Sequence, residues 1–257
     1  MVILLLIFGV GLAAGFVDAI AGGGGLIMLP GLIFSALPVS SAIATNKLCG
    51  TFGSLTSSLK FAQSKQIDWR ACTVMALPII LGAYLGSRSI GLLPSAWAEP
   101  LVIILMVAIT LFVVCNSGFG MAESRAKSAA DTANSPGKRT LWSIIAGGLI
   151  GFHDGFFGPG TGVFLVFVLL SLWPLNFLRA TGTTKVLNLL ANFMALMTFA
   201  IAGNIDYAKG AWGALGVAIG SFIGATFATK KGAKLIKPIF ILVTTALVMR
   251  LLIKYVT

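Results

Sequence analysis

The chain has 257 residues, of which 58% are hydrophobic and only 10% carry a charge. Because a soluble domain usually contains about 25% charged residues, this composition excludes a water-soluble globule. Each helical crossing of a bilayer needs about 20 apolar residues, so the length predicts about eight crossings joined by short loops. No room is left for a separate catalytic domain.

The net charge of +11 is carried mostly by Lys and Arg in short loops between apolar segments, where they set topology and meet anionic lipid headgroups. The lipid bilayer is therefore the expected partner, and no nucleic-acid platform is visible. Three cysteines without C-x-x-C spacing and a single histidine predict neither a disulfide framework nor a metal site, and no cofactor is expected. The apolar N-terminus lacks a preceding basic stretch, which predicts a retained membrane segment rather than a cleaved signal peptide.

Helices are the expected elements throughout, because a lipid-crossing segment must satisfy its own backbone amides. The uncharged stretches run over Val2 to Val17, Ala19 to Asn46, Leu48 to Leu59, Ala71 to Ser87, Leu101 to Ala122, Gly155 to Leu178, Val186 to Ile205, Gly210 to Thr229 and Pro238 to Met249. A polar linker, residues 117–139, separates a first membrane repeat, residues 1–116, from a second, residues 140–257.

The two halves repeat each other in sequence. AAGFVDAIAGGGG in the first half matches LIGFHDGFFGPGT in the second at an offset of 136 residues, and the offset becomes 138 after a two-residue insertion. The matched positions include Asp18 with Asp154, Gly24 with Gly160, Thr45 with Thr183, Lys47 with Lys185, Asp68 with Asp206, Gly82 and Gly86 with Gly220 and Gly224, and Pro100 with Pro238. Chance apolar similarity would not match the charged positions as well.

Each repeat is predicted to be a glycine-broken or re-entrant first helix followed by three transmembrane helices. If the first helix crosses the membrane once, each half has an even number of crossings and the two halves are parallel. If it turns back, each half has an odd number of crossings and the halves are inverted. Lys and Arg favour the cytoplasmic side. An inverted arrangement with the N-terminus outside places 12 loop cations inside and 4 outside, against 10 and 6 for the best parallel arrangement. This favours the all-helical inverted repeat, with the parallel one left open.

Two glycine-rich tracts interrupt the apolar stretches: Gly22, Gly23, Gly24 and Gly25 in the first half, and Gly158, Gly160 and Thr161 in the second. A helix-interior glycine costs about 1 kcal/mol and a proline about 3 kcal/mol, so the helices are expected to break there. Matching breaks in two repeats indicate a transporter's substrate site, and the amides of a restarting helix suit an anion. Close helix packing at glycine is the alternative. A dinucleotide loop is excluded because no strand precedes either tract.

Asp18 and Asp154 precede the two breaks by four residues. A charge inside a membrane helix costs about 2.5 to 3.5 kcal/mol, so each must be neutralised by a proton or by a lysine. A proton-coupling site and a structural cap on freed backbone amides are both open interpretations. His153 has Val17 as its mate, so a role for it would be asymmetric, either as a proton shuttle or as a hydrogen-bonding neighbour.

Two polar stripes follow, each with a lysine near its start. They contain Lys47, Thr51, Ser54 and Ser58 in one half, and Thr181, Lys185, Asn188 and Asn192 in the other. The spacing places each stripe on one helix face, which indicates a face directed into the bundle and an anion pathway. Lysines that snorkel at a helix end are the alternative for the charge. The expected substrate-binding set comprises the glycines and Thr161 named above together with Asn46, Lys47, Thr51, Thr184, Lys185 and Asn188.

The segments AGFVDAIAGGGGLIMLP, ATNKLCGTFGS, GFHDGFFGPGTG and ATGTTKVLN resemble the TauE/SafE sulfite-exporter family, and most closely its YfcA-like branch. The resemblance covers nearly the whole chain. It implies a permease of the bacterial inner membrane that moves sulfite, organosulfonates or related small anions. Thr184 departs from the pattern because its mate is Asn46. The resemblance also marks as candidate functional residues Asp18, the glycines at 22 to 25, Asn46, Lys47, Asp154, Gly158, Gly160 and Lys185.

We therefore expect a secondary transporter, an exporter of small anions, whose halves rock in alternating access with protons as the candidate coupling ion. An anion channel built on the same amides and lysines is the alternative. An enzyme is not expected, because no nucleophile lies beside a base and no metal cluster is present in the sequence. The oligomeric state stays open, with a homodimer as one option.

Overall fold

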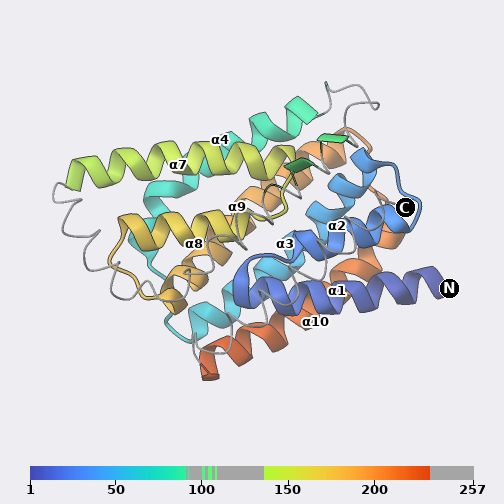
Figure 1. Ribbon diagram of the computed structural model, residues 1–257, viewed down its shortest axis with the longest axis horizontal. Coiled ribbons are helices and arrows are strands. Elements are labelled where there is room, and N and C mark those ends of the chain that lie inside the picture. Colours follow the sequence, from blue (N-terminus) through green and yellow to red (C-terminus); the bar gives the residue numbers. More distant parts are fainter. Residues whose placement is uncertain (91, 93–99, 102–103, 106–107, 109–135, 232–257) are drawn as a thin grey trace.

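The computed structural model describes residues 1–90, 92, 100–101, 104–105, 108 and 136–231. Their regular elements are helices, α1 Val2–Ala21, α2 Gly25–Phe34, α3 Val39–Gln63, α4 Trp69–Ile90, α7 Pro136–Phe156, α8 Thr161–Leu172, α9 Phe177–Ile201 and α10 Tyr207–Lys231 (Figure 1). Most of the expected linker, most of the stretch from Leu101 and the whole last stretch from Pro238 lie outside the described residues. Residues 136–139 of that linker belong to α7.

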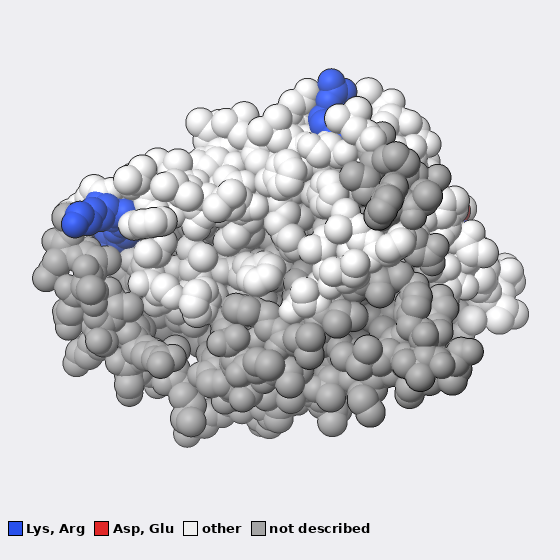
Figure 2. Space-filling view, turned by 45° about the horizontal axis from the view of Figure 1, so that its top comes forward, with Lys and Arg blue, Asp and Glu red and all other residues white. Residues whose placement is uncertain are grey.

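Four of the described helices, α1, α4, α9 and α10, are long and apolar enough to cross a membrane. Helix α3 is as long as α9, at 25 residues, but its polar stripe makes it less apolar. The short helices α2 and α8 have 10 and 12 residues. The described part of the surface in Figure 2 is almost free of charge, with Lys and Arg confined to small groups near its margin. Such a surface suits contact with lipid.

Both glycine tracts reverse the chain. Helix α1 ends at Gly22, whose φ of +78° lies in the left-handed region that glycine adopts without strain. Helix α2 then runs back along α1, because Gly24 lies against Ala14 and Gly31 lies against Val10. In the second half Gly158 has a φ of +98°, and α8 returns beside α7 (Figure 1). The predicted breaks are therefore the tips of two helical hairpins.

Long helices of opposite halves pack in close pairs. A methyl group at Gly220 of α10 would overlap the carbonyl oxygen of Leu12 in α1, and one at Gly82 of α4 would overlap that of Gly148 in α7. One turn further along, Gly224 meets Phe16 and Gly86 meets Phe152, so the helices of each pair run in the same direction. The two G-x-x-x-G motifs thus let helix backbones approach closely, as small residues do between membrane helices.

Two bundles result, and each contains helices of both halves. Helix α3 joins α1 and α10, where Thr45 Oγ1 accepts a hydrogen bond from the backbone N–H of Asp206 at 3.0 Å. Helix α9 joins α4 and α7, where Thr183 Oγ1 accepts from the N–H of Asp68 at 2.9 Å. The α1–α3–α10 bundle and the α4–α7–α9 bundle meet mainly where α3 packs on α9. The sequence halves are therefore not the packing units.

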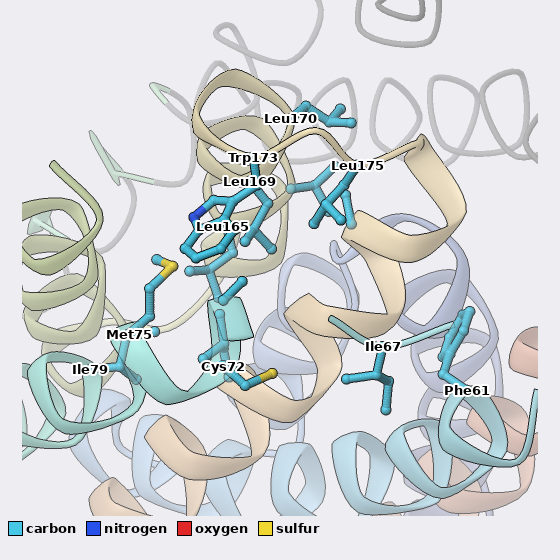
Figure 3. Close-up of a cluster of buried hydrophobic side chains, with 14 of the residues drawn as sticks. Phe61, Ile67, Cys72, Met75, Ile79, Leu165, Leu169, Leu170, Trp173 and Leu175 are labelled. Atoms are coloured by element: carbon cyan, nitrogen blue, oxygen red, sulfur yellow. The ribbon is translucent and has the colours of Figure 1, made fainter. Parts of the chain in front are cut away.

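Apolar clusters hold the short helices in place. Figure 3 shows one of them, in which Leu165, Leu169 and Trp173 at α8 face residues of α4 such as Cys72 and Met75. The indole Nε1 of Trp173 donates to Ser143 Oγ of α7 at 3.1 Å, which satisfies its buried N–H group. These contacts fix α8, and with it the tip of the second hairpin.

Candidate functional site

The two hairpin tips meet in the interior. Gly22 lies against Gly162, and Gly25 lies against Pro159. Beside them is a cavity of about 50 Å³, whereas one water molecule needs about 10–15 Å³. Its lining residues are Ala14, Asp18, Gly22, Gly24, Gly25, Met28, Asn46, Lys47, Cys49, Gly50, Asp154, Gly158, Gly160, Thr161, Gly162, Asn188, Asn192 and Val217. The cavity therefore has room for a small anion or a few waters.

One buried ion pair borders this cavity. Lys47 Nζ of α3 donates to Asp154 Oδ2 of α7 at 2.8 Å, and the two side chains are only 1% and 3% exposed. A Cβ atom at Gly158 would lie 2.7 Å from Lys47 Nζ, so a side chain there would displace the ammonium group. Charges buried this deeply are tolerated because each neutralises the other.

The equivalent ion pair of the other repeat is less deeply buried, because its aspartate is partly exposed. Lys185 Nζ of α9 lies 2.9 Å from Asp18 Oδ2, with the lysine side chain 0% and the aspartate side chain 20% exposed. Lys185 also donates to the backbone carbonyl oxygen of Asp18. The second carboxylate oxygen of Asp18 accepts from the backbone N–H of Gly24 at 3.1 Å. Asp18 is therefore both a partner of lysine and a cap on the broken helix.

Both ion pairs cross between halves and between bundles. Lys47 belongs to the α1–α3–α10 bundle and its partner to the other, and Lys185 belongs to the α4–α7–α9 bundle with its partner on α1. Together the four side chains carry two positive and two negative charges. The lysines are thus not free cations, and a ligand must compete with or supplement a carboxylate.

The cavity collects most of the expected binding residues, but not all of them. Of the expected binding residues, Gly23, Thr51, Thr184 and Lys185 are not among its lining residues, and neither is the candidate coupling residue His153. Thr51 Oγ1 donates to the backbone oxygen of Lys47 at 2.8 Å, within its own helix. The buried Thr184 Oγ1 has no hydrogen-bond partner among the described residues.

His153 contacts the second hairpin tip. Its Nδ1 lies 3.2 Å from Thr161 Oγ1, and that hydroxyl donates to the carbonyl oxygen of Gly158 at 2.7 Å. Because the single hydroxyl proton is used there, the histidine Nδ1–H is the donor to Thr161. His153 therefore supports the hairpin tip and is not a lining residue of the cavity.

Several lining residues were not expected from the sequence. Asn192 stood in the predicted polar stripe, so a signal for it existed. Cys49, Gly50 and Val217 are small or apolar and carry no such signal, since only the packing of α3, α9 and α10 brings them to the cavity. Among the described residues, no group of three or more His, Cys, Asp and Glu side chains could hold a metal ion.

Helical hairpins that meet tip to tip around a polar cavity, inside apolar helices, are characteristic of a membrane transport protein. The family described as "Sulfite exporter TauE/SafE" matches residues 7–251, and the chain belongs to this family. It is accordingly a membrane transporter and not an enzyme.

Related proteins match over almost their whole length. The chain is 34% identical to "Probable membrane transporter protein ORF9" of Sinorhizobium over 97% of this chain and 92% of that protein. It is 30% identical to a "Probable membrane transporter protein" of Haemophilus influenzae, over 94% and 91% of the two chains. It is 29% identical to "Probable membrane transporter protein YfcA" of Escherichia coli K12, over 96% and 88%. No solved structure matches the chain significantly.

Proposed function

We propose that the protein exports a small anion by alternating access, with sulfite and organosulfonates as the first substrates to test. The observation that supports this most directly is the cavity between the two hairpin tips, which Lys47 borders together with Gly158 and Gly160. An ammonium group and unwound backbone favour an oxyanion over a cation or a neutral solute. The family description supports the same substrate class.

Charge balance supports a proton as the coupling ion. The two ion pairs leave the site neutral, so an entering monoanion adds one uncompensated negative charge. A proton taken up by Asp154 would restore neutrality and release Lys47 to the anion, because their direct contact is 2.8 Å. Asp18, whose side chain is 20% exposed, is the second candidate for this proton. Anion and proton would then move in the same direction, so the outward anion gradient would drive export.

We infer that the halves form an inverted repeat and that the moving units are the two mixed bundles. In Figure 1, α1, α3 and α10 run in one direction and their repeat mates α7, α9 and α4 in the other. Close glycine contacts tie α1 to α10 and α4 to α7. A rocking motion is therefore easier between the two bundles, along the α3–α9 contact, than inside either bundle.

The placement of loop cations supports a multi-pass protein of the bacterial inner membrane with its N-terminus outside. Lys60, Lys65, Arg70, Lys138, Arg139, Arg179 and Lys230 stand at one end of the bundle, where α3 and α10 end and α4, α7 and α9 begin. The opposite end of the described helices has Arg88 and Lys209. By the positive-inside rule the richer end faces the cytoplasm. A homodimer remains a proposal for the assembly.

The test is anion flux into liposomes that contain the purified protein. Lys47→Ala should lower sulfite flux at least tenfold, because the cavity loses its ammonium group. Lys60→Ala is the matched control on the same helix, since Lys60 lies over the Phe222 ring, 5.5 Å from its centroid, outside the cavity. Equal flux in both variants would contradict the proposed site. Uphill sulfite movement under an imposed pH gradient supports the transporter, and rapid downhill conduction alone supports an anion channel.

A further inference from the structure

The cavity is not shared equally by the two repeats. Lys47 and Asn46 line it, whereas their mates Lys185 and Thr184 do not. On the other side Asn192 lines it, and its mate Ser54 does not. The hairpin glycines contribute from both repeats, so the asymmetry comes from α3 and α9. A ligand in this cavity would therefore meet one lysine, Lys47, and the amide side chains of α9, in addition to Asn46 and the two aspartates.

The α9 wall consists of two asparagines one turn apart. Asn192 Nδ2 donates to the backbone oxygen of Asn188 at 2.9 Å, which leaves its Oδ1 and its second N–H proton for another partner. Asn188 is only 5% exposed, and its Oδ1 has no hydrogen-bond partner among the described residues. A buried polar atom without a partner is costly, and in a lining residue it indicates a position for a ligand.

Gly50 of α3 makes room for this wall. It is the repeat mate of Asn188, so the amide on α9 has no counterpart on α3. A Cβ atom at Gly50 would lie 2.9 Å from Asn192 Oδ1, and any side chain there would push the amide out of place. The equivalent of Asn192 in the first half makes the same kind of bond, because Ser54 Oγ donates to the carbonyl oxygen of Gly50 at 2.6 Å, but Ser54 is not a lining residue of the cavity.

We propose that the anion binds off-centre, between Lys47 and the Asn188–Asn192 wall, and that Asn192 determines which anion is accepted. This inference rests on the proposed function. It adds on which side of the cavity the anion binds and which residue selects it. An amide offers both a donor and an acceptor, so the wall favours an oxyanion that also carries an O–H or N–H group over one without such a group. Lys185 is a positioning residue that fixes Asp18.

The test compares Asn192→Ser with Ser54→Ala in flux assays on reconstituted full-length protein. The anion panel contains hydrogen sulfite, a hydroxy-substituted sulfonate, methanesulfonate and nitrate. Asn192→Ser should raise KM about tenfold for the first two, with a smaller change for methanesulfonate and nitrate, because losing a hydrogen bond to a charged group is worth roughly a tenfold change or more. Ser54→Ala should change KM less than twofold. Equal effects of the two variants would overturn the proposal.

A second comparison separates this inference from the proposed function. Lys47→Ala should abolish anion-dependent thermal stabilisation, whereas Lys185→Ala should lower the melting temperature and keep the anion-dependent increase. If Lys47→Ala raises KM and Asn192→Ser does not, the cavity binds the anion and the selecting role of Asn192 is wrong. If Lys47→Ala leaves KM unchanged, the proposed function fails, and the inference fails with it.

A labelling experiment keeps the proposal testable if Asn192→Ser does not fold. In a chain whose natural cysteines are replaced by serine, Asn192→Cys should react with a small thiol reagent, and the hydroxy-substituted sulfonate of the panel at saturating concentration should slow that reaction at least threefold. Ser54→Cys is the matched control and should show no slowing. Equal slowing at both positions, or none at Asn192→Cys, would overturn the off-centre site.

Discussion

Lys47 donates to Asp154 at 2.8 Å although 107 residues separate them in the sequence. The contact joins α3 of the first repeat to α7 of the second, and so joins the two bundles. Its mate, the contact between Lys185 and Asp18, joins the bundles in the reverse sense. The four charges that each repeat would find costly alone in a membrane are therefore balanced only when both repeats are assembled.

Removing one member of the buried pair should destabilise the protein more than removing both. Asp154→Asn leaves Lys47 buried without its counterion, and breaking such a pair costs about 3–5 kcal/mol. Lys47→Met combined with Asp154→Leu should recover most of the free energy of unfolding but no anion transport. Denaturant unfolding in detergent measures both variants. A double variant that is no more stable than Asp154→Asn would contradict this account of the pair.

Proton coupling predicts a specific loss in the same variant. With Asp154→Asn, Lys47 stays available to the anion at every pH, so anion affinity should lose its increase toward low pH. The pH dependence of anion affinity is measured by titration calorimetry at several pH values, on folded protein isolated by gel filtration. Asp18→Asn is the comparison, because Asp18 pairs with Lys185 and not with Lys47. A pH dependence that disappears only in Asp18→Asn would move the coupling role to Asp18.

The close packing of α1 with α10 predicts that a glycine-to-alanine substitution changes the stability of the protein differently at two positions. Gly220→Ala should lower the free energy of unfolding by about 1–3 kcal/mol, because its methyl group would overlap the carbonyl oxygen of Leu12 in a packed interface. Gly9→Ala is the control, since no atom of the described residues lies within 4 Å of a Cβ atom at that position. It should be neutral or stabilise α1 by up to about 1 kcal/mol. Equal losses would mean that α1 and α10 are not in close contact.

Two buried cysteines provide a test of access to the cavity. Cys49 is 1% exposed and lines the cavity, whereas Cys72 is 5% exposed and belongs to the apolar cluster of Figure 3. In single-cysteine chains, Cys49 should react with a small charged thiol reagent while the protein cycles, and saturating anion should slow it. Cys72 should show no dependence on the anion. Labelling rates are measured by mass spectrometry. Slowing of Cys72 labelling by the anion, with no slowing at Cys49, would contradict the prediction.

The sequence was informative about local features of this fold. Glycines in an apolar helix are costly, and the helices do break at Gly22 and Gly158, where positive φ angles turn the chain. Matching charges at Asp18 and Asp154 indicate interior positions without indicating which residues are their partners. Such signals are local, because the cost of a glycine or a charge in lipid depends on little beyond its own segment.

The sequence does not predict which helices of the two repeats pack together. Loop charges favoured inverted halves but gave no indication that α1 would pack on α10 rather than on its own half. The pairing of α1 with α10 depends on the close approach of the two backbones at positions such as Gly220. In the sequence such a glycine cannot be told apart from any other small residue in an apolar helix. For the same reason the sequence predicts that Lys47 faces a ligand, and it predicts only that each aspartate takes up a proton or pairs with a lysine, without indicating which lysine.

The central claim is that one small anion binds beside Lys47 in the cavity between the hairpin tips. Crystals of the protein grown with selenite, a heavier analogue of sulfite, measure this most directly through anomalous scattering at the selenium edge. The account predicts a single selenium peak within hydrogen-bonding reach of Lys47 Nζ and the Asn192 side chain. A peak elsewhere in the protein, or no peak in the cavity at selenite concentrations that saturate transport, would contradict it.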